Sequence, residues 1–117
     1  MSKEREAQKA TAAIAAVSEQ EFPTVIGKQN TLILFSAGWC PHCRAMRPVL
    51  EELAKEHPAL HLYTVDADTA DTLTARYRIR SLPTLILFHN GEEVDRLVGF
   101  RRRQEIETLL IASPTPV

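Results

Sequence analysis

The sequence lacks the features that mark membrane proteins, nucleic-acid-binding proteins and disulfide-stapled secreted domains. Its longest apolar runs, Thr31–Ala37 and Leu82–Phe88, are as long as a strand and far shorter than the ~18 residues of a membrane span. Its 14 basic and 15 acidic residues give a net charge of -1, so no bulk field draws it to nucleic-acid phosphates or anionic lipids. Two cysteines are too few for a secreted scaffold held together by disulfides, and a chain of 117 residues can bury one core without such cross-links. We therefore expect a soluble one-domain protein with neither a nucleic-acid nor a membrane partner.

The N-terminal segment has no clear secretory signal. Residues Met1–Lys9 are polar and of mixed charge, and the apolar stretch that follows, Ala10–Val17, is short and mostly alanine. A signal peptide needs a longer apolar centre and a small-residue cleavage site. We expect a cytoplasmic protein; the alternative is an exported protein whose signal or anchor is absent from this sequence.

Hydrophobic patterning predicts an α/β domain. The continuous apolar run Thr31–Ala37 is typical of a strand buried on both faces, and the helical spacing of apolar residues in Arg44–His57 predicts a helix after it. A connecting helix of this length requires the next strand, Leu60–Val65, to run parallel to the first. These three elements form a βαβ unit.

The second half of the domain is expected to contain an antiparallel pair. Asn90-Gly91 tolerates the positive φ angles of a type I′ turn, so Leu82–Phe88 and Glu92–Val98 should form a hairpin. A helix over Arg101–Ile111 closes the domain. The chain then divides into a polar N-terminal extension with a frayed helical lead-in (1–11), one domain (12–111) and a tail (112–117).

Three shorter features rest on local signals. A short edge strand falls within Ala12–Val17, and Ser18 with Glu21 forms a capping-box pattern for a short helix. A further helix is expected within Asp66–Arg78, with Thr69 as its N-cap. The residues expected to be buried are Leu73, Ala75 and Tyr77 in that helix and Ile106, Leu109 and Leu110 in the last one.

Cys40 and Cys43 are the residues that carry chemistry. Cys40 follows a buried strand and precedes a long helix, where unpaired N–H groups and the helix dipole stabilise a thiolate. Pro41 fits the first helical turn, and His42 can add to the stabilisation as a donor or cation. Three-residue spacing places Cys43 one turn later, within reach of a disulfide. We expect an exposed attacking Cys40 and a buried resolving Cys43.

Two structural alternatives to this chemistry are weaker. A zinc site needs four ligands, but there is no second cysteine pair. A purely structural disulfide would close so short a loop that it would remove little chain entropy. We therefore expect no metal site. The histidines, dispersed along the chain, are His42, His57, His61 and His89.

The combined motifs resemble the thioredoxin family over roughly residues 12–111. They are Trp39–Cys43 after an apolar strand, Pro48, Leu82-Pro83-Thr84, Asn90-Gly91 and Val98-Gly99. The resemblance implies a thioredoxin fold, with a central mixed sheet of four to five strands flanked by helices on both faces. It also implies a monomeric protein-disulfide oxidoreductase that needs no cofactor beyond its own dithiol. Its partners would be protein disulfides and an electron donor, either a thioredoxin reductase or another thiol.

The same resemblance assigns a substrate-docking surface. Pro83 would be the family's cis-proline facing the cysteines, and the backbone of Leu82 would pair with an extended substrate. The apolar residues of the surface would be Trp39, Leu82, Pro83, Val98, Gly99 and Phe100. For Trp39 and Phe100 the alternative is ordinary core packing.

Three departures from the family pattern bear on function. Thioredoxin has Gly-Pro between its cysteines, whereas Pro41-His42 is the dipeptide of disulfide-forming oxidases of the DsbA type. The family's buried acid falls on Leu34, and the lysine that pairs with it falls on Leu62. Their joint loss is physically coherent, because one unpaired buried charge costs far more than two leucines. It removes a proton acceptor for Cys43.

Three functions remain open on these residues. The first is a cytoplasmic reductant of protein disulfides. The second is an exported disulfide oxidase or isomerase with a more oxidising potential. The third is a binding module that uses the surface around Trp39 and Phe100 and whose redox chemistry is slow.

Overall fold

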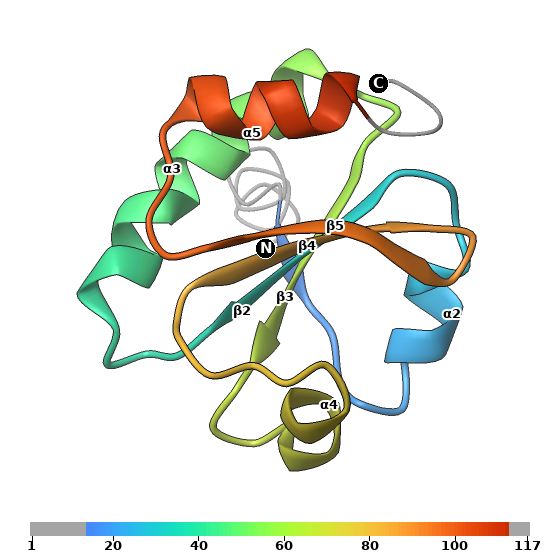
Figure 1. Ribbon diagram of the computed structural model, residues 1–117, viewed down its shortest axis with the longest axis vertical. Helices are drawn as coiled ribbons and strands as arrows, with labels where there is room; N and C mark the ends of the chain where they lie inside the picture. The colour runs from blue at the N-terminus through green and yellow to red at the C-terminus, as the bar shows by residue number, and fades with distance from the viewer. Residues whose placement is uncertain (1–13, 113–117) are drawn as a thin grey trace, which may run out of the picture.

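A computed structural model describes residues 14–112 (Figure 1). The expected helical lead-in and the part of the tail beyond Ala112 lie outside the described residues. The described chain forms one five-stranded sheet, in the order β1-β3-β2-β4-β5. The strands are β1 (Ala15–Ala16), β2 (Thr31–Ser36), β3 (His61–Asp66), β4 (Thr84–His89) and β5 (Glu92–Val98).

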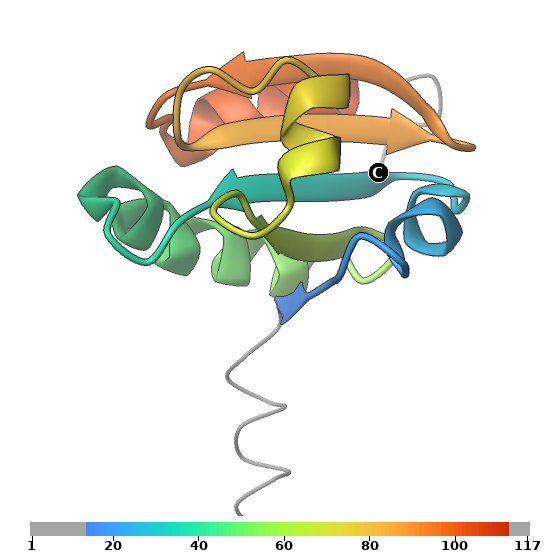
Figure 2. The same cartoon turned by 90° about the horizontal axis from the view of Figure 1, so that it is seen from below.

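The sheet is mixed, as expected. Strands β1, β3 and β2 run parallel, whereas β4 is antiparallel to β2 and β5 is antiparallel to β4. Figure 2 shows this order, with β2 in the middle of the sheet. Asn90 and Gly91 join β4 to β5 with φ angles of 53° and 90°, which confirms the turn that their sequence predicted.

Helices cover both faces of the sheet (Figure 1). They are α2 (Phe22–Ile26), α3 (Pro41–Glu56), α4 (Asp71–Arg76) and α5 (Arg103–Ile111). Alternate residues of β2 point to opposite faces, so Leu32 and Leu34 pack with α3 and α5 while Ile33 and Phe35 pack with α2 and α4. The continuous apolar run of β2 is therefore divided between two cores, as a strand buried on both faces requires.

The leucine core lies on the α3 and α5 side and includes the expected face of α5. Its α5 members are Ile106, Leu109 and Leu110. The aromatic core lies on the other face, where the rings of Phe22, Phe88 and Tyr77 meet at centroid distances of 5.4 to 5.7 Å. Edge-on and tilted contacts of this kind stabilise aromatic clusters beyond the area that they bury.

The prediction for the helix over Asp66–Arg78 was partly wrong. Helix α4 begins only at Asp71, its N-cap is Ala70, and Ala75 is exposed although Leu73 is buried. Thr69 caps nothing; its hydroxyl donates to the carbonyl of Asp66 at 3.4 Å. The Asp66 carboxylate accepts the N–H of Asp68 at 3.0 Å, and such a local turn competes with helix formation.

The capping-box residues before α2 do form their reciprocal bonds. The Ser18 N–H donates to the Glu21 carboxylate at 2.9 Å, and the Glu21 N–H donates to the Ser18 hydroxyl at 3.2 Å. These bonds lie in the turn that precedes α2, because its first helical residue is Phe22.

Candidate active site

The cysteine pair lies where the central strand gives way to the longest helix. Cys40 is the N-cap residue of α3, Pro41 is the first helical residue, and Cys43 lies in the first turn. The two sulfurs form a disulfide, with their Cα atoms 5.3 Å apart. The Cys43 N–H donates to Cys40 Sγ at 3.2 Å. One of the donors that a helix start leaves unpaired is therefore directed at the Cys40 sulfur, as expected.

The expectation of an exposed Cys40 was wrong for this disulfide form. Cys40 is 3% exposed and Cys43 is 4% exposed. Ala37 is buried in the same cluster, and Leu82 packs against it. The sequence places a cysteine at a helix start, but the cover over its sulfur comes from a loop far along the chain.

Leu82, the residue before Pro83, packs against the cysteine cluster. The Leu82–Pro83 peptide bond is cis, as the resemblance implied. The Pro83 carbonyl accepts the N–H of Gly99 at 2.8 Å, which ties the start of β4 to the end of β5. The N–H and C=O of Leu82 form no backbone hydrogen bond with any residue that the structure describes. An extended peptide can therefore pair with them.

An apolar rim surrounds this site, consisting of Trp39, Leu82, Val98, Gly99 and Phe100. Trp39 is 65% exposed and Phe100 is 42% exposed, so the alternative of core packing is wrong for both. The His42 ring, itself exposed, lies 6.3 Å from the Phe100 ring. The rim is exposed apolar surface beside a reactive group, which is typical of a docking surface.

Sequence reasoning missed Asp68, which positions the rim. Its carboxylate accepts the indole N–H of Trp39 at 3.0 Å. The two residues are 29 positions apart and come together only because β3 runs beside β2. Nothing local to Asp68 in the sequence signals this contact.

The positions that the resemblance linked to a buried charged pair are apolar in this fold. Leu34 is 1% exposed and Leu62 is 5% exposed, and both lie in the leucine core. Leu34 is paired with Thr64 of β3. A carboxylate and an ammonium are therefore replaced by ordinary hydrophobic packing.

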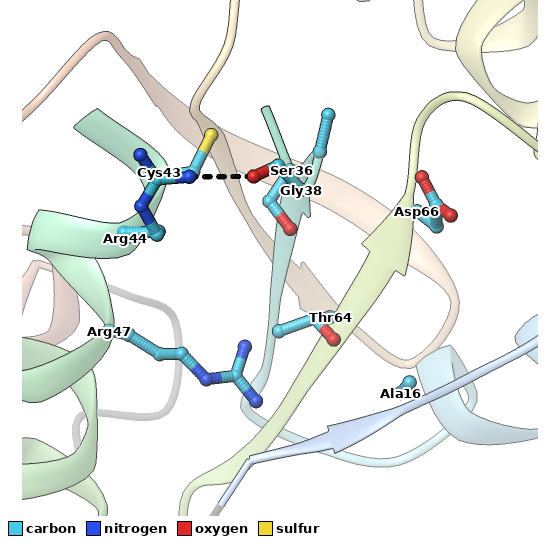
Figure 3. A pocket seen from close by; sticks show the side chains of 9 residues that line it. Ala16, Ser36, Gly38, Cys43, Arg44, Arg47, Thr64 and Asp66 are labelled. Atoms are coloured by element: carbon cyan, nitrogen blue, oxygen red, sulfur yellow. Dashed lines mark hydrogen bonds between the residues drawn. The ribbon is translucent and has the colours of Figure 1, made fainter. Parts of the chain in front are cut away.

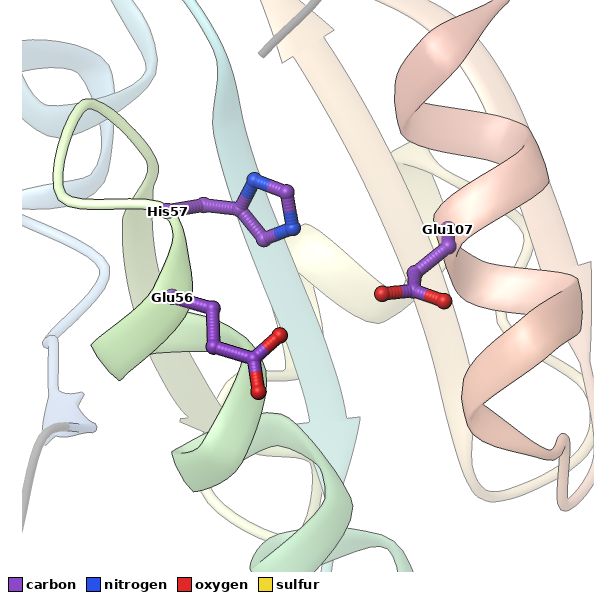
Figure 4. Close-up of side chains that lie close together, drawn as sticks. All are labelled: Glu56, His57 and Glu107. Atoms are coloured by element: carbon purple, nitrogen blue, oxygen red, sulfur yellow. The ribbon is translucent and has the colours of Figure 1, made fainter.

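Among the described residues, the group that could hold a metal lies away from the cysteines. Glu56, His57 and Glu107 converge at the far end of α3 (Figure 4). The Arg103 guanidinium donates to both Glu56 and Glu107. A cation thus already neutralises these carboxylates, and neither cysteine belongs to the group.

The site's chemistry follows from its sulfurs. A vicinal cysteine pair exchanges two electrons with other thiols and disulfides through a mixed disulfide. With this sheet, and with a cis-proline directly after a residue that packs against the pair, the molecule is a thiol–disulfide oxidoreductase of the thioredoxin fold.

Comparison with known proteins gives the family. The thioredoxin family profile matches residues 13–112. Thioredoxin of Chlamydia trachomatis is 38% identical, over 83% of this chain and 95% of its own length, and that of Staphylococcus epidermidis is 36% identical over 84% and 95%. A mutant thioredoxin from Halobacterium salinarum superposes with a TM-score of 0.79 at 30% identity, covering 89% of this chain and 92% of that one. The chain belongs to the thioredoxin family.

The described part of the chain contains no helix long and apolar enough to cross a membrane.

Proposed function

We propose that the protein reduces protein disulfides, with Cys40 as the nucleophile and Cys43 as the resolving cysteine. The observation that carries these roles is the hydrogen bond from the Cys43 N–H to Cys40 Sγ. A donor at a helix start stabilises the thiolate of the sulfur that it faces, which favours Cys40 as the attacking group.

The reaction proceeds by two exchanges. The Cys40 thiolate attacks a substrate disulfide, forming a mixed disulfide and releasing one substrate sulfur as a thiolate, which takes a proton. Cys43 then loses its proton and attacks the Cys40 sulfur. The second substrate thiol leaves, and Cys40 and Cys43 are joined as the disulfide. Two electrons have passed from the protein to the substrate.

Docking would use the apolar rim and the backbone of Leu82. An extended substrate segment pairs with the Leu82 N–H and C=O, and Pro83 keeps the substrate sulfur close to Cys40. Since backbone and apolar contacts carry little sequence information, many substrates should be accepted. Pro41 and His42 tune the thiolate from the first helical turn.

In the cell, the protein acts as a cytoplasmic monomer. Its disulfide is reduced by a thioredoxin reductase or another thiol donor, and it needs no cofactor beyond its own dithiol. The support is the family, because the curated relatives described above are thioredoxins. The exported oxidase keeps one specific observation in its favour, the Pro41-His42 dipeptide. Acceptance of electrons from a thioredoxin reductase separates the two: the reductant is turned over efficiently, and the oxidase is not.

Reduction of a model protein disulfide, driven by dithiothreitol, tests the activity. Cys40→Ser should abolish it, and Cys43→Ser should trap substrates as mixed disulfides through Cys40. The control is Ala45→Ser, at an exposed position of the same helix. Trapping by Cys40→Ser instead would reverse the assigned roles. Full activity without Cys40 would refute its role as nucleophile, and a wild-type rate no higher than that of dithiothreitol alone would leave only a binding module.

A further inference from the structure

A pocket of about 260 Å³ lies beside Cys43 (Figure 3). It opens beyond the carboxyl ends of β2 and β3, beside the first two turns of α3, and none of the rim residues lines it. Crevices at the carboxyl ends of parallel strands are common ligand sites in α/β folds. The lining residues are Ala16, Ser36, Ala37, Gly38, Cys43, Arg44, Arg47, Thr64 and Asp66.

The pocket carries an excess of positive charge. Arg44 and Arg47 both line it, and Arg47 makes no salt bridge or side-chain hydrogen bond with any residue in 14–112. Arg44 Nη1 donates to the Gly38 carbonyl at 2.6 Å, so its guanidinium is held at the pocket by a neutral partner. The carboxylate in the lining, Asp66, is engaged by the N–H of Asp68 in its own turn. The guanidinium of Arg47 therefore remains available for an anion from outside.

The remaining lining residues suit an organic anion. Ser36 and Thr64 contribute hydroxyl groups, each of which can donate one hydrogen bond. Ala16 and Ala37 contribute apolar wall, which an inorganic ion would leave without a partner. A guanidinium matches a carboxylate in a bidentate arrangement. We propose that this pocket binds a small aliphatic carboxylate, with Arg47 as its principal ligand and Ser36 and Thr64 as secondary donors.

Occupancy should also affect the resolving cysteine, a step that rests on the proposed function. The charged groups lining the pocket beside Cys43 are Arg44 and Arg47 of α3 and Asp66 of β3. A bound anion offsets the two cations, and negative charge near a thiol disfavours its thiolate. Because Cys43 attacks as a thiolate, the bound carboxylate slows its attack on Cys40.

Binding can be measured on the oxidised protein, so the result does not depend on catalysis. Glutarate is the probe, and ¹⁵N-labelled oxidised protein is titrated with it at constant ionic strength. In the NMR spectrum, chemical-shift changes that saturate with glutarate concentration are expected at the backbone amides of Ser36, Gly38, Cys43 and Thr64. Arg47→Gln should weaken binding at least about tenfold, because it removes a charge-assisted contact.

The controls separate this site from general anion attraction. Arg76→Gln, on α4 and outside the pocket, should leave the affinity unchanged. Thr64→Val conserves shape and should weaken binding about fivefold, which gives a second variant if Arg47→Gln alters the fold. Non-saturable shifts, or equal binding by the Arg47→Gln variant, would overturn the proposal. Equal affinity for inorganic phosphate would show a site for charge alone and would refute the carboxylate assignment.

The second step is tested on the mixed disulfide between Cys40 and thionitrobenzoate. Saturating glutarate should slow release of thionitrobenzoate about threefold, the effect of half a pKa unit on a thiolate population. The Arg47→Gln variant should show no slowing. An unchanged rate in the wild type at saturation would refute the effect on Cys43 and leave the binding site standing.

Discussion

Replacing Leu34 by aspartate should accelerate the resolving step and destabilise the fold, and the structure indicates the size of the second effect. Leu34 is 1% exposed, so the substitution removes about 2–3 kcal/mol of apolar burial. An unpartnered carboxyl group adds about 1–3 kcal/mol. The sum is about 3–6 kcal/mol. Domains are typically stable by roughly 5–15 kcal/mol, so the loss could unfold a domain at the lower end of that range, and folding must be monitored.

The kinetic effect comes from a proton acceptor placed where Leu34 now packs. In the wild type, the leucine core of the described residues holds no such base, and we expect Cys43 to lose its proton to solvent, so resolution should accelerate with pH towards the ordinary thiol pKa of about 8.5. A positioned base typically contributes about 10²–10⁴-fold, and an unoptimised one should give at least about tenfold near neutral pH.

The assay is stopped-flow release of thionitrobenzoate from its mixed disulfide with Cys40, across neutral and alkaline pH. Leu32→Asp is the matched control: Leu32 is fully buried on the same strand and in the same leucine core, two residues further from the cysteines. It should cost similar stability without accelerating release. If Leu34→Asp is no faster than Leu32→Asp, or the wild-type rate is already independent of pH near neutrality, the reasoning about the missing base is wrong.

Three further predictions concern His42, the rim and α5. Because a donor or cation at His42 favours the thiolate, the reduction potential should lie between about -270 mV, typical of thioredoxin, and about -120 mV, typical of DsbA; a glutathione titration giving a value at or below the former would contradict this. Trp39→Ala and Phe100→Ala should each raise KM for a protein disulfide several-fold while leaving reaction with a small aromatic disulfide unchanged, and equal losses on both substrates would argue against docking. The N–H of Arg102 donates to the Glu105 carboxylate at 2.9 Å and lowers the pKa of Glu105. The charged Glu105 therefore stabilises the fold. This stabilisation is fully present above the ordinary carboxyl pKa of about 4.3 and is lost as the pH falls through the lowered pKa of Glu105, so Glu105→Gln should reduce Tm at neutral pH but not in strong acid. A Tm difference that persists in acid would exclude the charged form as its cause.

The elements with strong local signals could be predicted from the sequence. The run Thr31–Ala37 contains the central strand, and the Asn90-Gly91 turn forms where its positive φ angles are needed. The α5 face could be predicted because its apolar residues recur at helical spacing. In each case neighbours in sequence determine the structure.

Two of the features that sequence reasoning missed depend on distant residues. Cys40 is buried because Leu82 packs beside it, and Trp39 is oriented by Asp68 across two strands. The start of α4 is delayed by a side-chain turn at Asp66 that outcompetes the expected cap. That turn is local, whereas the contacts of Leu82 and of Asp68 with Trp39 exist only after the sheet has assembled, so periodicity and capping patterns do not report them.

The alternation of β2 between two cores makes the molecule adjustable in two independent ways. Leu34 faces the leucine core, whereas its neighbour Phe35 faces the aromatic core on the far side of the sheet. Substitutions at well-separated sites without shared partners act almost additively. A stabilising substitution in the aromatic core should therefore add almost in full to the effect of a destabilising one at Leu34, and so offset the stability that a carboxylate at that position removes.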